Sequence, residues 1–316
     1  MNEAHDRFLQ LFKEGRLLSP DALQQLEVDL AREPNNLDAR ATVLGGYSAD
    51  LEPRLPDFLR HQRWIIENVP GDVLAESAVT CTVGLRKLYP SAYRELHDAW
   101  CERVRSEPVT LSTLVHAWMF FMLHEEFEMA EHAARQSMAR APDDSAPIEM
   151  LVDVVDSSNT ATSERCEELF LLADGVLERD TDLLKMLGLS VRLADFALRT
   201  KNWSHASEFA KRVLHRPGAC DKAGSAIHAA HVVLGRLALK DGDQASACKH
   251  LLESLEIPGD TFFEPDLELA TELLMKGELE TVEEYLGLCM QFPLSDYERS
   301  QLRTWCLQMG VLPPFS

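Results

Sequence analysis

The sequence predicts an all-α protein built as an α-solenoid, in which antiparallel helix pairs stack in order along the chain. Three observations lead to this class. Alanine and leucine are plentiful whereas aromatic residues make up only 7% of the 316 residues, and Ala and Leu are the residues that lose least on entering a helix. Small residues and prolines recur together at matched intervals. No stretch shows the alternating pattern with hairpin turns that is typical of β-strands.

The recurring frame is clearest in the C-terminal half. Its small residues are 41 and 35 positions apart, and prolines repeat the same two intervals. Small residues let two helices approach closely, and proline ends the second helix of a pair. The glycines at positions 242 and 277 fall where the two helices of a pair should turn, because glycine accepts positive φ. The markers are Ala194, Gly235 and Ala270, followed by Pro217, Pro258 and Pro293.

The same frame occurs once in the N-terminal half, over residues 111–144. Its markers are Leu114, Ala117, Phe121, Ala130, Ala134 and Pro142. These positions resemble the 34-residue tetratricopeptide pattern, although Trp118 stands where that repeat usually has a small residue. Residues 111–144 and 187–294 therefore look like divergent tetratricopeptide repeats. The resemblance implies a right-handed superhelix that serves protein–protein interaction.

The other elements follow in order. Helices are expected over residues 21–34, with Ser19 as N-cap, and over 93–108 and 164–177. The Gly45-Gly46 pair is interpreted as a turn, and the proline-containing stretch 49–57 as a connection. A Ser/Thr/Asn run at 156–163 suggests a hinge, so we expect an N-terminal helical region over 1–156 and C-terminal repeats over 157–316. Ser295 and Glu298 have capping-box spacing and predict a last helix that caps the repeats.

Charge and composition narrow the function. The net charge of −21 argues against direct nucleic-acid binding. Residues 141–186 carry 12 acidic and 3 basic side chains, and residues 253–284 carry 11 and 1. These strips are interpreted either as solvated helix faces or as docking surfaces for a basic partner. The longest apolar run is about ten residues, half of a membrane span.

Localisation is expected to be cytoplasmic, because the first residues show no secretory signal and the seven cysteines are scattered with no C-x-x-C spacing.

Catalytic and cofactor motifs are missing from the sequence. There is no G-x-S-x-G and no glycine-rich phosphate loop. His124, Glu128 and His132 are four residues apart, but the repeat frame puts a turn between the two histidines, so surface roles are expected. His231 is expected to pack partly buried beside His228. We therefore predict no enzyme activity, no metal and no cofactor.

The first helix of each repeat should line a concave groove that is apolar with a few charges, which suits a partner protein or peptide. The predicted function is a non-catalytic scaffold or adaptor, acting as an accessory subunit. A peptide- or ligand-sensing regulator, a metal-dependent hydrolase and a self-assembling protein remain alternatives, and the oligomeric state is open. The predicted groove residues are Val115, Met119, Met122, Val191, Asp195, Leu198, Val232, Arg236, Leu239, Leu267, Thr271 and Leu274.

Overall fold

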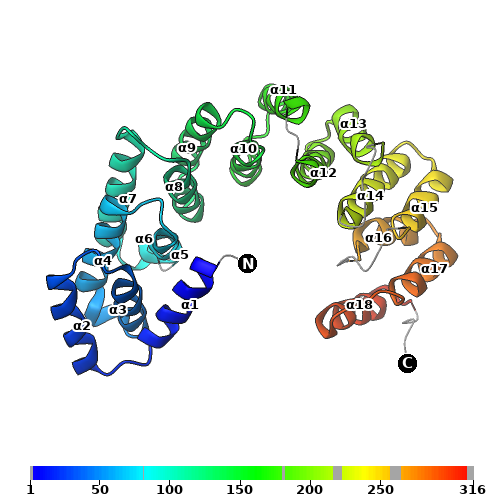
Figure 1. The fold of residues 1–316 in the computed structure, drawn as a ribbon. Coiled ribbons are helices and arrows are strands. Elements are labelled where there is room, and N and C mark those ends of the chain that lie inside the picture. The colour runs from blue at the N-terminus through cyan, green and yellow to red at the C-terminus, as the bar shows by residue number, and fades with distance from the viewer. Residues whose placement is uncertain (1–2, 81, 180–181, 216–222, 257–264, 312–316) are drawn as a thin grey trace. The chain divides into compact units, whose positions relative to one another are not determined.

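A computed structural model gives the structure of the protein and describes residues 3–80, 82–179, 182–215, 223–256 and 265–311. Within these ranges all regular structure is helical, which confirms the all-α class (Figure 1). Among the residues that the structure describes, no helix combines the length and the apolar character needed to cross a membrane.

The chain forms two compact units, residues 1–142 and 143–316. The helices of the first unit are α1 (Glu3–Gly15), α2 (Pro20–Arg32), α3 (Leu37–Ala49), α4 (Leu51–Asn68), the 3-10 turn η1 (Val73–Glu76), α5 (Ser77–Thr80), α6 (Leu85–Leu88), α7 (Pro90–Arg105), α8 (Leu111–Leu123) and α9 (Phe127–Arg140). Those of the second are α10 (Ala146–Ser157), α11 (Ser163–Arg179), α12 (Leu183–Arg199), α13 (Trp203–Leu214), α14 (Gly224–Lys240), α15 (Gln244–Glu253), α16 (Leu267–Met275), α17 (Leu279–Cys289) and α18 (Asp296–Met309).

The boundary between the units falls after Pro142, whereas the sequence suggested a hinge at 156–163. That polar run instead closes the turn between α10 and α11. The hydroxyl groups of Ser158 and Thr160 are 2.6 Å apart, and a guanidinium nitrogen of Arg165 donates to the Thr160 hydroxyl at 2.5 Å. The Ser/Thr side chains hold the turn together, so this segment belongs inside the second unit.

Four helix pairs share one turn geometry. They are α8–α9, α12–α13, α14–α15 and α16–α17, and the central turn residue has positive φ in each: 59° at Glu125, 63° at Lys201, 82° at Gly242 and 92° at Gly277. The next N–H donates to the carbonyl five residues earlier, at 2.8–3.1 Å. This is a Schellman motif, which satisfies carbonyls that the helix end would leave unpaired. The repeat frame predicted all four pairs.

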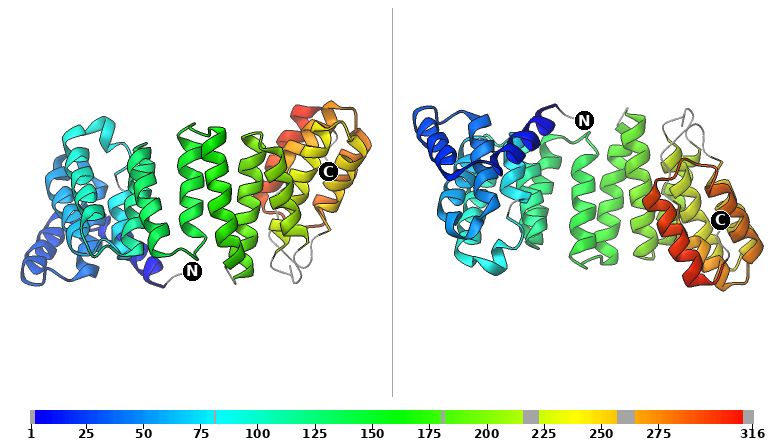
Figure 2. Two further views of the ribbon diagram at one scale, coloured as in Figure 1. Left: turned by 90° about the horizontal axis from the view of Figure 1, so that it is seen from above. Right: turned by 90° about the horizontal axis from the view of Figure 1, so that it is seen from below.

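Helices of the second unit pack mainly against their near neighbours in sequence. α12 contacts α13 and α14, α14 contacts α15 and α16, and α15 contacts α16 and α17. In Figure 2 these helices, coloured green to orange, lie side by side. Close approach depends on the predicted small residues: a Cβ atom on Gly235 would lie 2.5 Å from Leu269 Cδ2.

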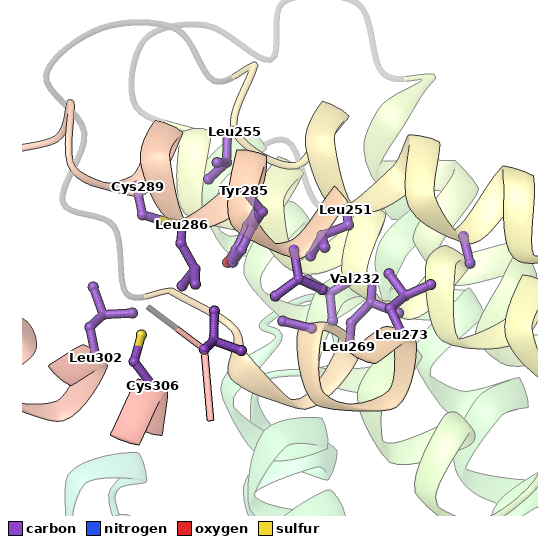
Figure 3. Close-up of a cluster of buried hydrophobic side chains, with 14 of the residues drawn as sticks. Val232, Leu251, Leu255, Leu269, Leu273, Tyr285, Leu286, Cys289, Leu302 and Cys306 are labelled. Atoms are coloured by element: carbon purple, nitrogen blue, oxygen red, sulfur yellow. The ribbon is translucent and has the colours of Figure 1, made fainter. Parts of the chain in front are cut away.

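The C-terminal core confirms the predicted last helix. Leu302 and Cys306 of α18 are buried in one cluster with Tyr285 of α17 and Leu269 of α16 (Figure 3). The Ser295 side chain accepts from the N–H of Glu298 at 3.3 Å, and the Glu298 carboxylate accepts from the N–H of Ser295 at 2.6 Å. This reciprocal capping box starts the helix.

Two expectations for the N-terminal region are wrong. Gly45 and Gly46 are not a turn but lie inside α3. α1 crosses α3 so closely that a Cβ atom on Gly45 would lie 2.1 Å from the Phe12 carbonyl oxygen. The stretch 49–57 is not a connection either, because α4 begins at Leu51 and contains Pro56. Packing against α3 and α7 outweighs the hydrogen bond that Pro56 cannot make.

Candidate functional site

A pocket of about 860 Å³ lies in the first unit, between α2, α4 and the start of α7. This volume is within the roughly 300–1,000 Å³ typical of binding pockets. Its wall is largely apolar, and the principal apolar side chains are Leu30, Leu55, Leu59, Trp64, Pro90 and Ala92. Arg40 of α3 also lines the pocket although its side chain is only 4% exposed. The pocket therefore combines apolar surface with a buried cation.

A chain of hydrogen bonds holds Arg40 in place. Its Nη1 lies 2.8 Å from Nδ1 of the buried His61, and its Nη2 donates to the Pro34 carbonyl at 2.5 Å. On the other side, His61 Nε2 lies 2.8 Å from Glu27 Oε1. Arginine has only donors, so Nδ1 must accept and Nε2 must carry the hydrogen that Glu27 receives. Both nitrogen atoms of this imidazole are thus engaged by the protein.

The pKa values of these groups follow from burial and the bonds between them. Burial would raise the pKa of Glu27, but hydrogen bonds from His61 and Tyr47 outweigh burial and lower it to about 2. Burial lowers the pKa of Arg40 to about 10, which leaves the guanidinium charged at neutral pH. Burial and the bond to Glu27 raise the pKa of Tyr47. At neutral pH the Glu27 carboxylate and the Arg40 guanidinium are therefore both charged, and the His61 ring lies between them.

Within the part of the chain that the structure describes, no carboxylate pairs directly with the Arg40 guanidinium. Its Cζ lies 3.5 Å from the centroid of the Trp64 ring, a cation–π arrangement. Its Nε is buried and has no hydrogen-bond partner among the described residues. Among the described residues, Arg40 is linked to the Glu27 carboxylate through His61.

Charged side chains surround the mouth of the pocket. Arg60 is 58% exposed and lies 2.9 Å from Glu27. Arg63 is 52% exposed and pairs with Glu67 at 2.6 Å and with Glu95 at 3.6 Å. An apolar centre within a polar rim is the usual anatomy of a protein-binding surface.

The predicted groove residues of the first unit lie on α8. Met119 and Met122 are half-buried and line an apolar hollow of about 460 Å³ together with Val83 and Trp118. Val115 is half-buried on the same helix. Two of the three residues are thus brought together beside open space.

The predicted groove residues of the second unit are largely part of its packing. Leu198 and Val232 are 7% and 5% exposed, so they fill the core and do not face a groove. Leu239, Leu267 and Leu274 are half-buried against the C-terminal cluster. Val191 is half-buried on α12.

The polar members of the predicted groove are engaged by the protein itself. Thr271 Oγ1 accepts a hydrogen bond of 3.0 Å from Trp305 Nε1 of α18, so the capping helix covers this position. Arg236 pairs with Glu268 at 2.7 Å and with Glu272 at 3.0 Å. Asp195 pairs with Arg199 at 2.9 Å. In this unit the three polar groove residues therefore already have partners within the chain.

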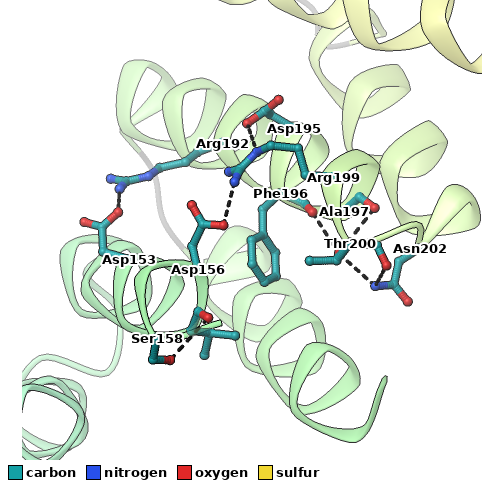
Figure 4. Close-up of polar contacts among 11 residues, drawn as sticks. Asp153, Asp156, Ser158, Arg192, Asp195, Phe196, Ala197, Arg199, Thr200 and Asn202 are labelled. Atoms are coloured by element: carbon teal, nitrogen blue, oxygen red, sulfur yellow. Dashed lines mark hydrogen bonds and ion pairs between the residues drawn. The ribbon is translucent and has the colours of Figure 1, made fainter. Parts of the chain in front are cut away.

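The first acidic strip is partly neutralised inside the second unit. Arg192 of α12 pairs with Asp153 of α10, and Arg199 pairs with Asp156 at 2.5 Å (Figure 4). Arg192 also pairs with Glu149 of α10 at 3.3 Å. These cations lie beyond residue 186, so counting charges within 141–186 overstated the free negative charge. On the second strip, Glu280, Glu283 and Glu284 are exposed on α17.

The histidines that the sequence singled out are distributed differently from expectation. His124 is not a surface residue but 5% exposed at the end of α8, with its Nε2 3.1 Å from the Thr82 hydroxyl. His132 is exposed on α9, so these two do not share a site. His231 is half-buried as predicted, but its close neighbour is His250.

Sequence reasoning missed the pocket and its polar network. Glu27, Arg40 and His61 lie on three different helices, and Glu27 and His61 are 34 positions apart in the sequence. One feature of the sequence could have indicated the network. Arg40 and His61 lie in helical segments among apolar residues, and this placement predicts that both side chains are buried and hydrogen-bonded within the protein. Comparison with known proteins adds nothing to this site, since no protein-family model and no curated protein matches the sequence.

Proposed function

We propose that this protein is a non-catalytic binding protein, a scaffold of helix pairs whose first unit captures an apolar side chain of a partner peptide in the pocket beside Arg40. The observation that carries the proposal is the pocket itself, with its apolar wall, its buried guanidinium and its charged rim. Arginine and tryptophan, which stack here, are the residues that most often dominate protein interfaces.

The energetics support an anchor residue. Burying a Leu- or Phe-sized side chain contributes about 1.5–3 kcal/mol. The carbonyl groups of a peptide would find donors in Arg60 and Arg63, which lie at the mouth of the pocket and are more than half exposed. Because Arg40 is held by His61 and Pro34 before any peptide arrives, little ordering entropy has to be spent there on binding.

We propose no catalytic role, because both ring nitrogen atoms of His61 in the pocket already have hydrogen-bond partners in the protein. A general base needs a nitrogen atom that can take a proton from substrate. His61 uses Nδ1 to accept from Arg40 and Nε2 to donate to Glu27. We propose no nucleic-acid partner, because the net charge is −21. We place the protein in the cytoplasm on its composition.

The architecture that we propose is a right-handed α-solenoid related to tetratricopeptide repeats. Four turns of the same Schellman geometry and packing between near neighbours in the second unit support it. Repeat proteins of this kind stack units that cannot bury their apolar faces alone. They generally bind other proteins, which agrees with the proposed role of the pocket.

The test begins with a displayed random peptide library panned against the whole chain. Selected peptides are then measured by fluorescence anisotropy against two variants of α2. Ala31 lines the pocket and is exposed, so Ala31→Trp should fill the mouth without disturbing the core. Gln24 is exposed on the same helix outside the pocket, and Gln24→Trp is the matched control. We expect affinity to fall more than about tenfold, or about 1.4 kcal/mol, in Ala31→Trp alone.

Two outcomes would change the conclusion. Peptides that bind both variants equally would move the site away from the pocket. A library that yields no peptide, while small apolar carboxylates raise the melting temperature of the wild type and not of Ala31→Trp, would favour ligand sensing. The pocket volume is the observation that favours this second function.

A further inference from the structure

Two histidines and a glutamate meet on the α14–α15 pair of the second unit. His231 comes from α14, and His250 and Glu253 come from α15. The two Nδ1 atoms are 3.0 Å apart. Glu253 Oε2 lies 3.7 Å from His231 Nδ1 and 3.8 Å from His250 Nδ1. The three side chains are partly buried, with 14%, 25% and 30% of their surface exposed.

These distances match the ligand spacing of a zinc site. Zinc holds nitrogen and carboxylate oxygen at about 2.0–2.2 Å in tetrahedral geometry, which places neighbouring ligand atoms about 3.4 Å apart. The triangle formed by the three atoms has a point about 2 Å from all of its corners, as such a site requires. Among the described residues, this is also the group of histidine, cysteine and acidic side chains whose ligand atoms come within 4.8 Å of one another.

We propose that His231, His250 and Glu253 form a binding site for a divalent transition-metal ion, with zinc as the ion that fits the ligands best. Imidazole suits zinc, whereas magnesium and calcium prefer sites made of oxygen atoms alone. Three protein ligands leave a fourth position for water or for a group supplied from outside. This site is in the second unit and does not depend on the pocket beside Arg40.

The ligands are available for a metal at neutral pH. Burial lowers the pKa of His231 to about 4, and it also lowers the pKa of His250. Both rings are therefore neutral, and a nitrogen lone pair is free to bind an ion once the hydrogen shared between the two Nδ1 atoms moves to Nε2. Lys249 competes weakly, because it is 72% exposed and contacts the other carboxylate oxygen, Oε1, at 3.4 Å.

The two helices that carry the ligands are joined by a short turn and closely packed. His231 and His250 lie on helices joined by the Schellman turn at Gly242, and a Cβ atom on Gly235 would lie 3.3 Å from the Cβ of His250. The two helices are therefore closely packed at the site. An ion bound here would tie α14 to α15, so metal binding should also stabilise the second unit.

The experiment uses the full chain, stripped of metal with a chelator and dialysed. Zinc is titrated by calorimetry into the wild type, His231→Asn, His250→Asn and Glu253→Gln. His132→Asn is the matched control, because His132 is an exposed histidine of the first unit. We expect one zinc per chain, and affinity reduced more than about tenfold in each ligand variant, since even outer-shell partners contribute that much. The control should bind as the wild type does.

Cobalt distinguishes this site from the cysteines. Thiolate ligands give a cobalt complex a near-ultraviolet charge-transfer band, whereas two imidazoles and a carboxylate do not. We therefore expect the cobalt-loaded protein to show no such band. No saturable zinc binding, wild-type affinity in the histidine variants, or a thiolate band would each overturn the proposal. Glu253→Gln removes a partly exposed carboxylate, so it keeps the test valid even where a histidine variant fails to fold by circular dichroism.

Discussion

Replacing Gly45 with alanine tests whether a close crossing of two helices organises the N-terminal region. Gly45 lies in α3, and an added Cβ atom would be 2.1 Å from the carbonyl oxygen and 3.0 Å from the Cα of Phe12 in α1. Both obstacles are backbone atoms. No side-chain rotation can relieve the overlap, so α1 has to move away from α3.

The expected magnitude comes from two opposing effects. Alanine in a helix interior is more stable than glycine by about 1 kcal/mol. Against this, α1 must move by more than about 1 Å to reach ordinary contact, and overpacking of this kind typically costs about 1–3 kcal/mol. The displaced helix is held by Phe8, which is 6% exposed, and burial of one phenylalanine contributes up to about 3 kcal/mol. We therefore expect Gly45→Ala to lower the free energy of unfolding by about 2 kcal/mol.

Gly188→Ala is the matched control. Gly188 lies inside α12, is exposed, and has nothing within 4 Å of the position of an added Cβ atom. At that position only the difference in helix propensity between glycine and alanine matters, so this variant should be more stable than the wild type by about 0.5–1 kcal/mol. Urea unfolding of both variants, with hydrogen exchange of α1, measures the difference. Equal shifts of the same sign would refute the reasoning, because they would mean that α1 does not rest on α3.

Two further predictions concern polar groups. The pKa of Glu27 is lowered from 4.5 to about 2, so its ionised form stabilises the fold above pH 4.5. This contribution is about 2 kcal/mol after allowance for solvent at Arg60, and it is lost as the pH falls towards 2. Glu27→Gln should lack that component of the pH dependence in urea titrations, and an unchanged pH profile would contradict the network. Ser295→Ala should cost about 1 kcal/mol by removing the capping box, whereas Ser300→Ala, an exposed serine of the same helix, should be neutral. Equal melting temperatures for the two serine variants would count against the cap.

The helix pairs of the C-terminal half could be predicted because their requirements are local. A turn that needs positive φ selects glycine, as at Gly242 and Gly277. A close helix crossing selects a small residue, as at Gly235. Glu125 and Lys201 adopt the same turn conformation without a glycine to reveal it. There the prediction of a turn rested on the repeat frame alone.

The N-terminal helices were harder to predict, because glycine and proline lie inside helices there and do not mark turns or connections. Gly45 is a contact point inside a helix and not a turn, and the sequence cannot separate the two without knowing that α1 crosses there. Pro56 lies inside α4, where packing retains a helix that local propensity disfavours. Such tertiary effects depend on partners distant in sequence.

Two predicted groove residues of the second unit, Leu198 and Val232, are buried for a related reason. The repeat frame identifies which helix face is apolar, but it does not say what covers that face. Trp305 of the last helix reaches Thr271, and Val232 is part of the buried cluster beneath α18. The last helix thus contacts Thr271 and shares a buried cluster with Val232, two positions that the frame assigns to a partner.

The buried guanidinium of Arg40 is the feature that stability alone explains least. Removing such an ion from water costs several kcal/mol, and the return depends on direct pairing and full hydrogen bonding. Arg40 has neither, since its Nε lacks a partner among the described residues and its charge meets Glu27 only through His61. An apolar residue in place of Arg40 would leave His61 Nδ1 and the Pro34 carbonyl without the donor they have now, so the stability of the site depends on the whole network. A buried guanidinium with no direct carboxylate partner among the described residues, placed at the wall of an apolar pocket, suits recognition of a polar feature beside an apolar anchor, and this supports the proposed binding function of the first unit.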